Sequence, residues 1–260
     1  MKLIPVIKAL LIIYLLLCTT VYLLQRSIIY RPVELISHGF DTIKFNKNNH
    51  TIEAITTHYE ESNPDSDVII YFGGNAENVI YTAHDFASNL KHHTTYLLKY
   101  RGYSGAEGQA SEHNLYADAL AIFDQVSKKH NGNITIVGRS LGSAIATYLA
   151  SKRPVNQLIL VTPFDSMVQV AKGILPILPV DWLLTERFDS KSRASAINVP
   201  TLIITAENDE VIPFARTESL INSIPVDLVK TTVIEAGHND IDLAPQYFKE
   251  IQQFVFQIER

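Results

Sequence analysis

A serine between two glycines is the first feature of this sequence that could do chemistry. The motif G-x-S-x-G occurs as Gly138-Arg139-Ser140-Leu141-Gly142, directly after the apolar run Ile134 to Val137 and before a stretch rich in small residues. In this setting the motif predicts a sharp turn from a strand into a helix, where glycine lets the backbone pass closely and the serine hydroxyl is exposed. We predict Ser140 as a nucleophile, and the alternative is an ordinary loop serine.

A serine hydroxyl is a weak nucleophile, so it needs a base to accept its proton and an acid to orient that base. His238 lies in IEAGHNDI, just after an apolar run that ends at Ile234, and Asp209 lies in ITAENDEVIP, just after a run that ends at Thr205. Both positions are loops after strands, where open α/β sheets place their sites. The order Ser, Asp, His is typical of the α/β-hydrolase fold. The sequence therefore predicts Ser140, Asp209 and His238 as a catalytic triad.

The acid is the least determined member of this triad. Glu207, Glu210 and Asp165 compete with Asp209, which the following turn Val211-Ile212-Pro213 favours. Two further carboxylates, Asp240 and Asp242, follow His238 too closely to be its usual partner, and we interpret them as helix-capping or surface residues. The other eight histidines show no metal-binding spacing, and we expect them to be structural or solvated.

Acyl transfer also requires backbone N–H donors for the oxyanion. One donor is expected from the residue after the nucleophile, Leu141, and the other from the loop YFGGNAEN, where Gly73 and Gly74 allow the backbone to turn its amides inward. Asn75 is the candidate second donor, and the alternative is a simple glycine turn. A third glycine loop, Lys99 to Ser111, is expected at the edge of the site, although it matches no nucleotide-binding fingerprint.

The elements that must position these residues follow an α/β rhythm. Short apolar runs predict strands at Val68–Phe72, Thr94–Leu98, Ile134–Val137, Leu158–Val161, Thr201–Thr205 and Val229–Ile234. Longer stretches between them predict helices at Asn78–Lys91, Glu112–Lys129, Leu141–Arg153, Phe214–Ser223 and Ala244–Ile258. Strands that are apolar on both faces are typical of a parallel sheet with helices on both sides. The alternating segment Thr51–Tyr59 predicts an antiparallel hairpin at the start of the sheet.

One segment interrupts this rhythm. The stretch Met167–Ile197 contains GILPILPVDWLL, with two prolines and the only tryptophan of the chain, Trp182. Its apolar residues are expected to pack on the core one by one, or together to form a lid over an acyl-binding cleft. We therefore predict a small insertion rather than a second domain, and we call this segment the insertion.

The N-terminus differs from the rest of the chain because Ala9 to Leu24 carries no charge. With the preceding apolar residues this makes a span of about 20 residues, which is long enough to cross a bilayer. We predict a membrane anchor over residues 1–27, followed by one catalytic domain over residues 28–260. A cleaved signal peptide is the alternative, although no small-x-small cleavage site follows the span. Positive charges before and after the span nearly balance, so the side of the membrane that carries the domain stays open.

Composition excludes several classes of function. The chain has 260 residues, 47% of them apolar, and a formal net charge of -5. Such a chain has no excess of cations to pair with phosphates, so nucleic-acid binding is not expected. Its single cysteine, Cys18, lies in the apolar run and can form no internal disulfide.

Six segments together carry a family resemblance: GGNAEN, YRGYSGAEG, GRSLGSA, PFDS, ENDEVIP and GHND, in this order. From about Ile28 to the C-terminus the chain resembles the α/β-hydrolase-domain proteins related to serine aminopeptidases and to membrane-associated protein depalmitoylases. The resemblance implies an α/β-hydrolase fold, Ser140, Asp209 and His238 as nucleophile, acid and base, and Asn75 with Leu141 as oxyanion donors. This chain departs from the pattern at Gly73, where relatives commonly have histidine.

The sequence thus predicts a membrane-anchored serine hydrolase of the carboxylesterase or thioesterase type that forms an acyl-enzyme and needs no cofactor or metal. Because the expected anchor holds the site at a bilayer, a lipid or acylated molecule is the favoured substrate. A serine peptidase is the alternative among enzymes. An inactive scaffold or binding module on the same fold is the alternative outside them. Oligomeric state, natural substrate and acyl chain length are not encoded in any pattern that we find.

Overall fold

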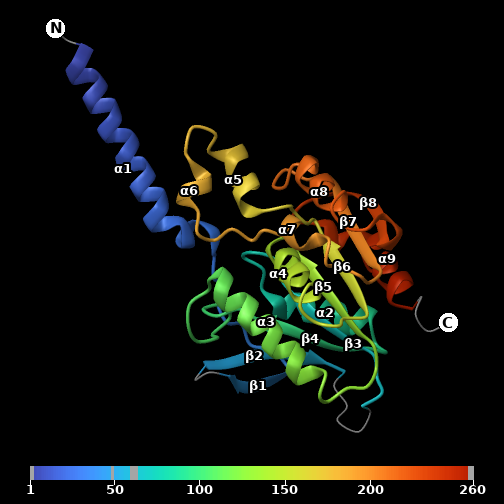
Figure 1. The fold of residues 1–260 in the computed structure, drawn as a ribbon. Coiled ribbons are helices and arrows are strands. Elements are labelled where there is room, and N and C mark those ends of the chain that lie inside the picture. The colour runs from blue at the N-terminus through green and yellow to red at the C-terminus, as the bar shows by residue number, and fades with distance from the viewer. Residues whose placement is uncertain (1–2, 48–49, 59–63, 257–260) are drawn as a thin grey trace.

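The computed structural model describes residues 3–47, 50–58 and 64–256 (Figure 1). A single eight-stranded sheet runs through the domain in the order β1-β2-β4-β3-β5-β6-β7-β8. In chain order the elements are α1 (Leu3–Ile29), β1 (Asp41–Lys47), β2 (His50–Thr57), β3 (Val68–Phe72), α2 (Val79–Asn89), β4 (Thr94–Lys99), α3 (Glu112–Val126), β5 (Ile134–Arg139), α4 (Leu141–Ala150), β6 (Gln157–Val161), α5 (Met167–Ile174), α6 (Val180–Leu183), α7 (Lys191–Ala194), β7 (Thr201–Asn208), α8 (Phe214–Ile221), β8 (Val229–Gly237) and α9 (Pro245–Val255), with short 3₁₀ turns at Val226–Leu228 and Ile241–Leu243.

Most of the sheet is parallel. Strands β4, β3, β5, β6, β7 and β8 pair in parallel, whereas β1 pairs antiparallel with β2, and β2 antiparallel with β4. The predicted α/β-hydrolase fold with a mostly parallel sheet is therefore confirmed. The predicted hairpin at the start of the sheet is formed by β1 and β2, although Tyr59, its predicted last residue, lies outside the described residues.

Two hydrophobic cores lie on the two faces of the sheet. Because side chains alternate along a strand, Ile70 and Phe72 of β3 face one core, and Ile69 and Tyr71 face the other. Helices α3, α4 and α8 cover the first face, and α2 and α9 cover the second. The predicted helices form with slightly shorter bounds, and the predicted end of the last one, at residues 257–258, lies outside the described residues.

Helix α1 projects away from the sheet (Figure 1, blue). It is long and apolar enough to cross a membrane, with a mean hydropathy of 2.3 over its most apolar window, of which 6% is buried. Residues 1 and 2 of the predicted anchor lie outside the described part of the chain. The C-terminal half of α1 contacts the rest of the protein, because Cys18 packs in a small cluster with Val168, Leu178, Val180 and Leu184.

The insertion lies between β6 and β7 and contains α5, α6 and α7. Helices α5 and α6 lie beside α1, and α7 lies closer to α4 and α8 (Figure 1). The first half of the insertion therefore packs on the N-terminal helix, whereas Phe188, Ala194 and Ile197 of its second half belong to the main hydrophobic core.

Candidate active site

Ser140 lies at the turn between β5 and α4 in a strained conformation. Its φ of 50° and ψ of −114° lie in a region that residues with a side chain rarely adopt. The turn needs glycine on both sides: a Cβ on Gly138 would lie 2.3 Å from the carbonyl oxygen of Gly142, and one on Gly142 would lie 2.0 Å from that of Phe72. The backbone N–H of Ser140 donates to the carbonyl of Val161 at 2.9 Å. The predicted strand-turn-helix geometry is present.

The three side chains predicted for the triad form a chain of hydrogen bonds. The imidazole Nε2 of His238 lies 3.0 Å from the hydroxyl oxygen of Ser140. The other ring nitrogen, Nδ1, lies 2.8 Å from Oδ2 of Asp209 and 3.0 Å from its Oδ1. Ser140 and His238, which are 98 positions apart, thus meet with Asp209 at the carboxyl ends of β5, β7 and β8 because these strands are parallel.

Asp209 is the carboxylate that contacts His238. Burial disfavours the ionised form of this carboxyl. Its hydrogen bonds with His238 and with the N–H groups of Ile212 (2.7 Å) and Val211 (2.9 Å) favour the ionised form and outweigh the effect of burial. The pKa of Asp209 therefore lies below its ordinary value. The turn that favoured Asp209 in the sequence supplies these two donors.

The competing carboxylates lie elsewhere. Asp165 is buried and bonds to Arg216 at 3.1 Å, and Glu207 is exposed. Glu210 accepts the backbone N–H of His238 at 3.3 Å and so supports the loop without touching the ring of this histidine.

The loop after β3 lies against Ser140. A Cβ on Gly74 would lie 3.6 Å from the Cβ of Ser140. The side chain of Asn75 is held by two donors to its Oδ1, the hydroxyl of Tyr103 and the backbone N–H of Arg31, each at 2.9 Å. Within the described residues, neither the N–H of Asn75 nor that of Leu141 enters a hydrogen bond. Asn75 and Leu141 line the same cavity as Ser140, so their N–H groups are candidates for the oxyanion donors.

Glu77 was missed by the sequence analysis, and it organises this loop. Its Oε2 accepts the backbone N–H of Gly74 at 2.6 Å, and its Oε1 accepts the hydroxyls of Tyr71 (2.8 Å) and Thr82 (2.6 Å). The hydroxyl of Tyr100 fixes the same loop by donating to the carbonyl of Gly73 at 2.7 Å. The one available signal was an acidic residue inside an otherwise neutral glycine loop.

Arg139, the variable residue before Ser140 in the motif, holds the histidine loop. Its guanidinium donates to Oδ2 of Asp242 at 3.1 Å and to the carbonyls of His238 (3.3 Å) and Asn239 (3.1 Å). Burial alone would lower the pKa of this guanidinium, but nearby Tyr71, Glu77 and Asp242 together raise it. Asp242 is thus an ion-pair partner rather than the capping or surface residue that we expected. Asp240 does cap a turn, because its Oδ1 accepts the N–H of Gly237 at 2.7 Å.

Two cavities of different character meet at Ser140. We call the first the apolar cavity; it has a volume of about 390 Å³ and is walled by α1, α5 and the loops after β6 and β7. The second, the polar cavity, has a volume of about 280 Å³ and is lined by the Gly74 to Asn78 loop, Arg139, His238 and Asp242. A larger polar cavity of about 530 Å³ lies between the insertion and α8, and its lining contains none of the three predicted triad residues. The reactive hydroxyl therefore sits between an apolar and a polar compartment.

This fold and site define a serine hydrolase, and the comparison with known families agrees. The serine hydrolase family matches residues 83–257, so the chain belongs to this family. The resemblance to α/β-hydrolase-domain proteins that we found in the sequence is confirmed by the relatives.

One relative is an uncharacterized protein of Mycobacterium tuberculosis, 35% identical over 150 residues, which are 56% of this chain and 53% of the relative. Another is alpha/beta hydrolase domain-containing protein 17C of Xenopus tropicalis, 33% identical over 159 residues, 60% of this chain and 50% of the relative. The matched part of the chain spans about half the length of these relatives. Among solved structures, Est1E from Butyrivibrio proteoclasticus with bound ferulic acid has the same fold, with a TM-score of 0.69 at 15% identity over 84% of this chain and 100% of that one.

Proposed function

We propose that this protein is a membrane-anchored serine hydrolase that cleaves an ester or thioester of an acylated substrate through an acyl-enzyme. The observation that carries the proposal is the continuous hydrogen-bonded chain from Asp209 through His238 to Ser140, whose hydroxyl opens onto an apolar cavity. Carboxylate, imidazole and hydroxyl in this arrangement are the parts that covalent acyl transfer requires.

In the first half of the reaction, Nε2 of His238 accepts the proton of the Ser140 hydroxyl while the oxygen bonds to the carbonyl carbon of the substrate. The negative oxygen of the tetrahedral intermediate accepts hydrogen bonds from the N–H groups of Asn75 and Leu141. As the bond to the leaving oxygen or sulfur breaks, His238 returns the proton to that atom. Asp209 stays ionised and stabilises the imidazolium through Nδ1.

In the second half, His238 accepts a proton from water, whose oxygen attacks the carbonyl carbon of the acyl-Ser140 ester. The same two N–H groups stabilise the second oxyanion. The acid leaves when His238 returns the proton to the Ser140 oxygen, so the enzyme is regenerated. Atoms and protons balance with water as the only co-reactant.

The two cavities support an acylated substrate over a peptide. The apolar cavity is lined mostly by aliphatic side chains, with Gln25, Arg31, Asn75 and Ser140 as the polar exceptions. Such a wall suits a hydrocarbon chain, and the polar cavity beside His238 suits the leaving group. A serine peptidase remains the competing activity, and it is separated from the esterase by comparing fatty-acyl thioesters with amino-acyl amides.

Contacts of α1 with the domain support retention of this helix as an anchor. The buried side chain of Gln25 accepts the backbone N–H of Thr185 at 2.7 Å, and Arg26 pairs with Glu186 at 2.8 Å. A signal peptide is discarded after translocation, and it would not be expected to hold buried contacts in the mature protein. The proposed organisation is an anchor over residues 1–27 and a hydrolase domain over residues 28–260, with the insertion at 167–197.

The test uses the full chain in vesicles with a fluorophosphonate probe and fatty-acyl thioester substrates. Wild-type protein should label and hydrolyse, and Ser140→Ala should lose labelling and at least about three orders of magnitude of activity without unfolding. A Ser140→Ala variant as active as wild type would contradict the mechanism, and wild-type protein that neither labels nor hydrolyses would indicate a scaffold. Mass spectrometry of the N-terminus after alkaline extraction of membranes distinguishes an intact anchor from a cleaved signal peptide.

A further inference from the structure

One face of helix α1 forms a wall of the apolar cavity. Val21, Gln25, Ile28 and Ile29 all line the cavity that contains Ser140. Their spacing of four, three and one residues puts them on one stripe of the helix. The neighbouring residues Leu23 and Leu24 lie outside this stripe and are exposed. The same helix therefore presents one face to the cavity and another to its surroundings.

Buried polar contacts fix this face of α1 against the insertion. The amide of Gln25 accepts from both the backbone N–H (2.7 Å) and the hydroxyl (2.9 Å) of Thr185, and it donates to the carbonyl of Leu183 at 3.2 Å. One residue later, Arg26 pairs with buried Glu186, whose Oε2 also accepts the hydroxyl of Tyr30 at 2.5 Å. Because Gln25 is only 5% exposed, these contacts take the place of water around its amide, and removing the side chain would break all three hydrogen bonds.

The opposite wall of the cavity comes from α5. Met167, Val170, Ala171 and Ile174 of this helix line the cavity, together with Leu175 that follows it. The space between the two walls leads from Ser140 to a part of the surface where Ile174 is 71% exposed. The cavity thus runs between the anchor helix and the insertion rather than into the interior of the domain.

Part of the insertion lies beside the middle of α1, at a depth that would be inside the bilayer if α1 spans it. The hydroxyl of Tyr14 donates to the carbonyl of Ile177 at 3.0 Å. The part of α1 before Tyr14, Leu3 to Ile13, measures roughly 17 Å at 1.5 Å per residue. Because a hydrocarbon core is about 30 Å thick, α1 can cross it only if the level of Tyr14 and Ile177 lies within the membrane.

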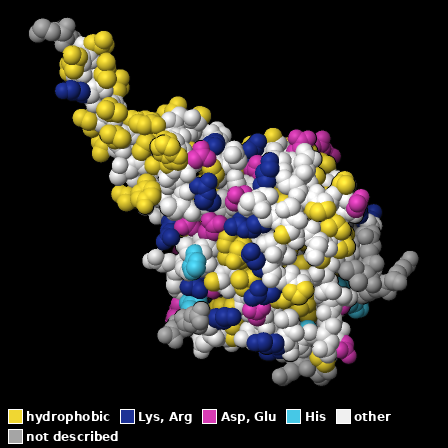
Figure 2. Space-filling model, in the orientation of Figure 1, with side chains coloured by type: hydrophobic (Ala, Val, Ile, Leu, Met, Phe, Trp, Pro, Cys, Tyr) yellow, Lys and Arg dark blue, Asp and Glu magenta, His cyan; other side chains and the backbone are white. Residues whose placement is uncertain are grey.

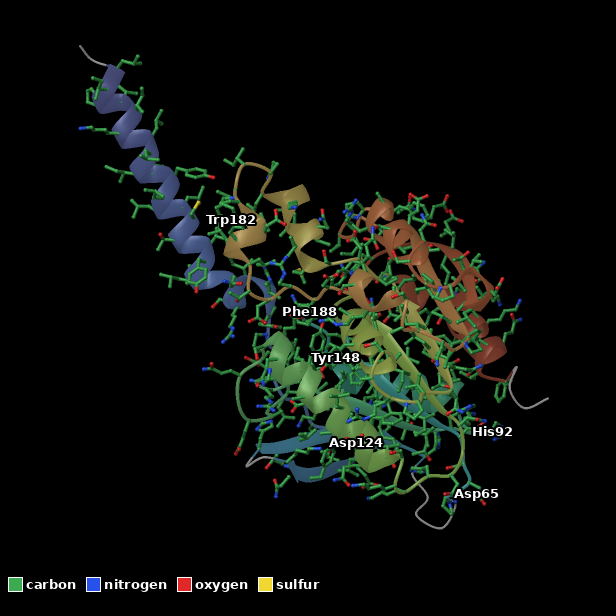
Figure 3. The ribbon with its side chains drawn as sticks, in the orientation of Figure 1. Asp65, His92, Asp124, Tyr148, Trp182 and Phe188 are labelled. Carbon is green, nitrogen blue, oxygen red and sulfur yellow. The ribbon has the colours of Figure 1, made fainter. Side chains whose placement is uncertain are left out.

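Exposed side chains of the insertion agree with this depth. Ile177 is 73% exposed and Trp182 is 88% exposed. Figure 3 shows Trp182 on α6 beside α1, and Figure 2 shows hydrophobic side chains that cover α1 and continue onto the adjacent part of the domain. Exposed tryptophan and isoleucine are costly in water but favourable at a membrane interface.

We propose that the anchor helix is part of the substrate-binding site: the acyl chain of a membrane-resident ester or thioester enters between α1 and α5 directly from the bilayer, and lies against Val21, Ile28 and Ile29. This inference rests on the proposed function, and it adds the path by which the acyl chain enters and the helix that binds it. The acyl chain does not have to pass through water, because the opening between α1 and α5 lies at the same depth as the lipid tails. The carbonyl then meets Ser140, and the leaving group lies in the polar cavity on the side of His238.

The experiment compares two positions on α1 in the full chain reconstituted in phosphatidylcholine vesicles. Val21→Trp narrows the cavity, and Leu23→Trp places the same side chain on the exposed face of the same helix. The readout is the ratio of kcat/KM for a palmitoyl thioester to kcat/KM for a butyryl thioester, which cancels differences in the amount of folded enzyme. We expect Val21→Trp to lower this ratio by at least about tenfold, as mismatched apolar pockets do, and Leu23→Trp to leave it unchanged.

A second variant protects the test against misfolding of the first. Ile28 is about half exposed, so Ile28→Trp should fold, and it should lower the ratio in the same direction. The inference is overturned if both cavity variants keep the wild-type ratio, or if Leu23→Trp lowers it equally. Failure of the proposed function looks different, because Ser140→Ala would then hydrolyse both thioesters like the wild type.

Discussion

The two cavities that meet at Ser140 are built from different kinds of chain. The polar cavity is lined by loops that follow strands of the parallel sheet and by the start of α2, and hydrogen bonds of Glu77 and Arg139 hold its loops. The apolar cavity is also bordered by such loops, but its outer walls are α1 and the insertion, which lie outside the sheet and are held to each other by Gln25 and an apolar cluster. Under the proposed function, the loops of the sheet hold the residues that react, and α1 with the insertion selects the acyl group; we call this the division of labour.

The strongest test of the polar side is Asp209→Asn, which removes the charge that orients and stabilises His238. We expect kcat to fall by about 10⁴. The factor should be the same for palmitoyl and butyryl thioesters, because the substitution impairs His238 as a base and leaves the apolar cavity unchanged. Steady-state kinetics on both substrates measure this. Glu207→Gln, at an exposed carboxylate near the end of β7 and two residues before Asp209, is the matched control and should behave like wild type. A loss confined to the long chain would contradict the division of labour.

A smaller loss is expected from Glu77→Gln. The amide offers N–H groups where the carboxylate now accepts three donors, so the loop that carries Asn75 should shift. We expect kcat to fall by about a hundredfold, because misplacing a reacting group by about 1 Å costs that much, with the palmitoyl to butyryl ratio unchanged. Glu107→Gln, on the exposed part of the next loop, is the control. Unchanged kcat and unchanged fluorophosphonate labelling rates would show that the loop does not depend on Glu77.

On the apolar side, Gln25→Ala should separate α1 from the insertion. The two hydrogen bonds from Thr185 would be lost, and at about 0.5 to 1.5 kcal/mol each their loss lowers Tm by several degrees in a domain of this size. Because α1 would then form a less rigid wall of the apolar cavity, we expect the ratio of kcat/KM for the palmitoyl thioester to that for the butyryl thioester to fall by about fivefold. This is less than the full discrimination that apolar pockets provide. Ser27→Ala on the exposed side of α1 is the control. Thermal melts measure the change in Tm, and kinetics on the two thioesters measure the ratio. A lower Tm with an unchanged ratio would show that Gln25 contributes to stability and not to acyl-chain selection.

The smallest effect concerns pH. The pKa of Asp209 is lowered in the folded state, so its ionised form stabilises the fold above the unfolded-state pKa of about 3.9, and this contribution is lost as the pH falls through the lower folded-state value. Wild type should therefore be more stable than Asp209→Asn at neutral pH, and the difference should shrink below about pH 4. Denaturant unfolding of both proteins at a series of pH values checks this. A constant difference across that range would contradict the lowered pKa.

Sequence patterns alone predict the sheet and the part of the candidate site that is attached to it. Strands apolar on both faces predict a parallel sheet, and the ends of parallel strands lie at one edge, so Ser140, Asp209 and His238 could be brought together on paper. For the acid, the sequence favours Asp209 over three other carboxylates, Glu207, Glu210 and Asp165. The contact itself depends on the turn at Val211 and Ile212, which fixes the direction of the Asp209 side chain.

Contacts between segments that are far apart in the chain follow from no sequence pattern and appear only in the folded protein. Arg139 belongs to the G-x-S-x-G motif, yet its guanidinium donates to the carbonyls of His238 and Asn239, about 100 positions later, and no spacing rule connects them. Helix α1 was predicted as an anchor from its hydropathy, yet hydropathy cannot tell which stripe of a uniformly apolar helix faces a cavity. That stripe is set by Gln25, whose amide is buried against the insertion 160 positions away in the sequence.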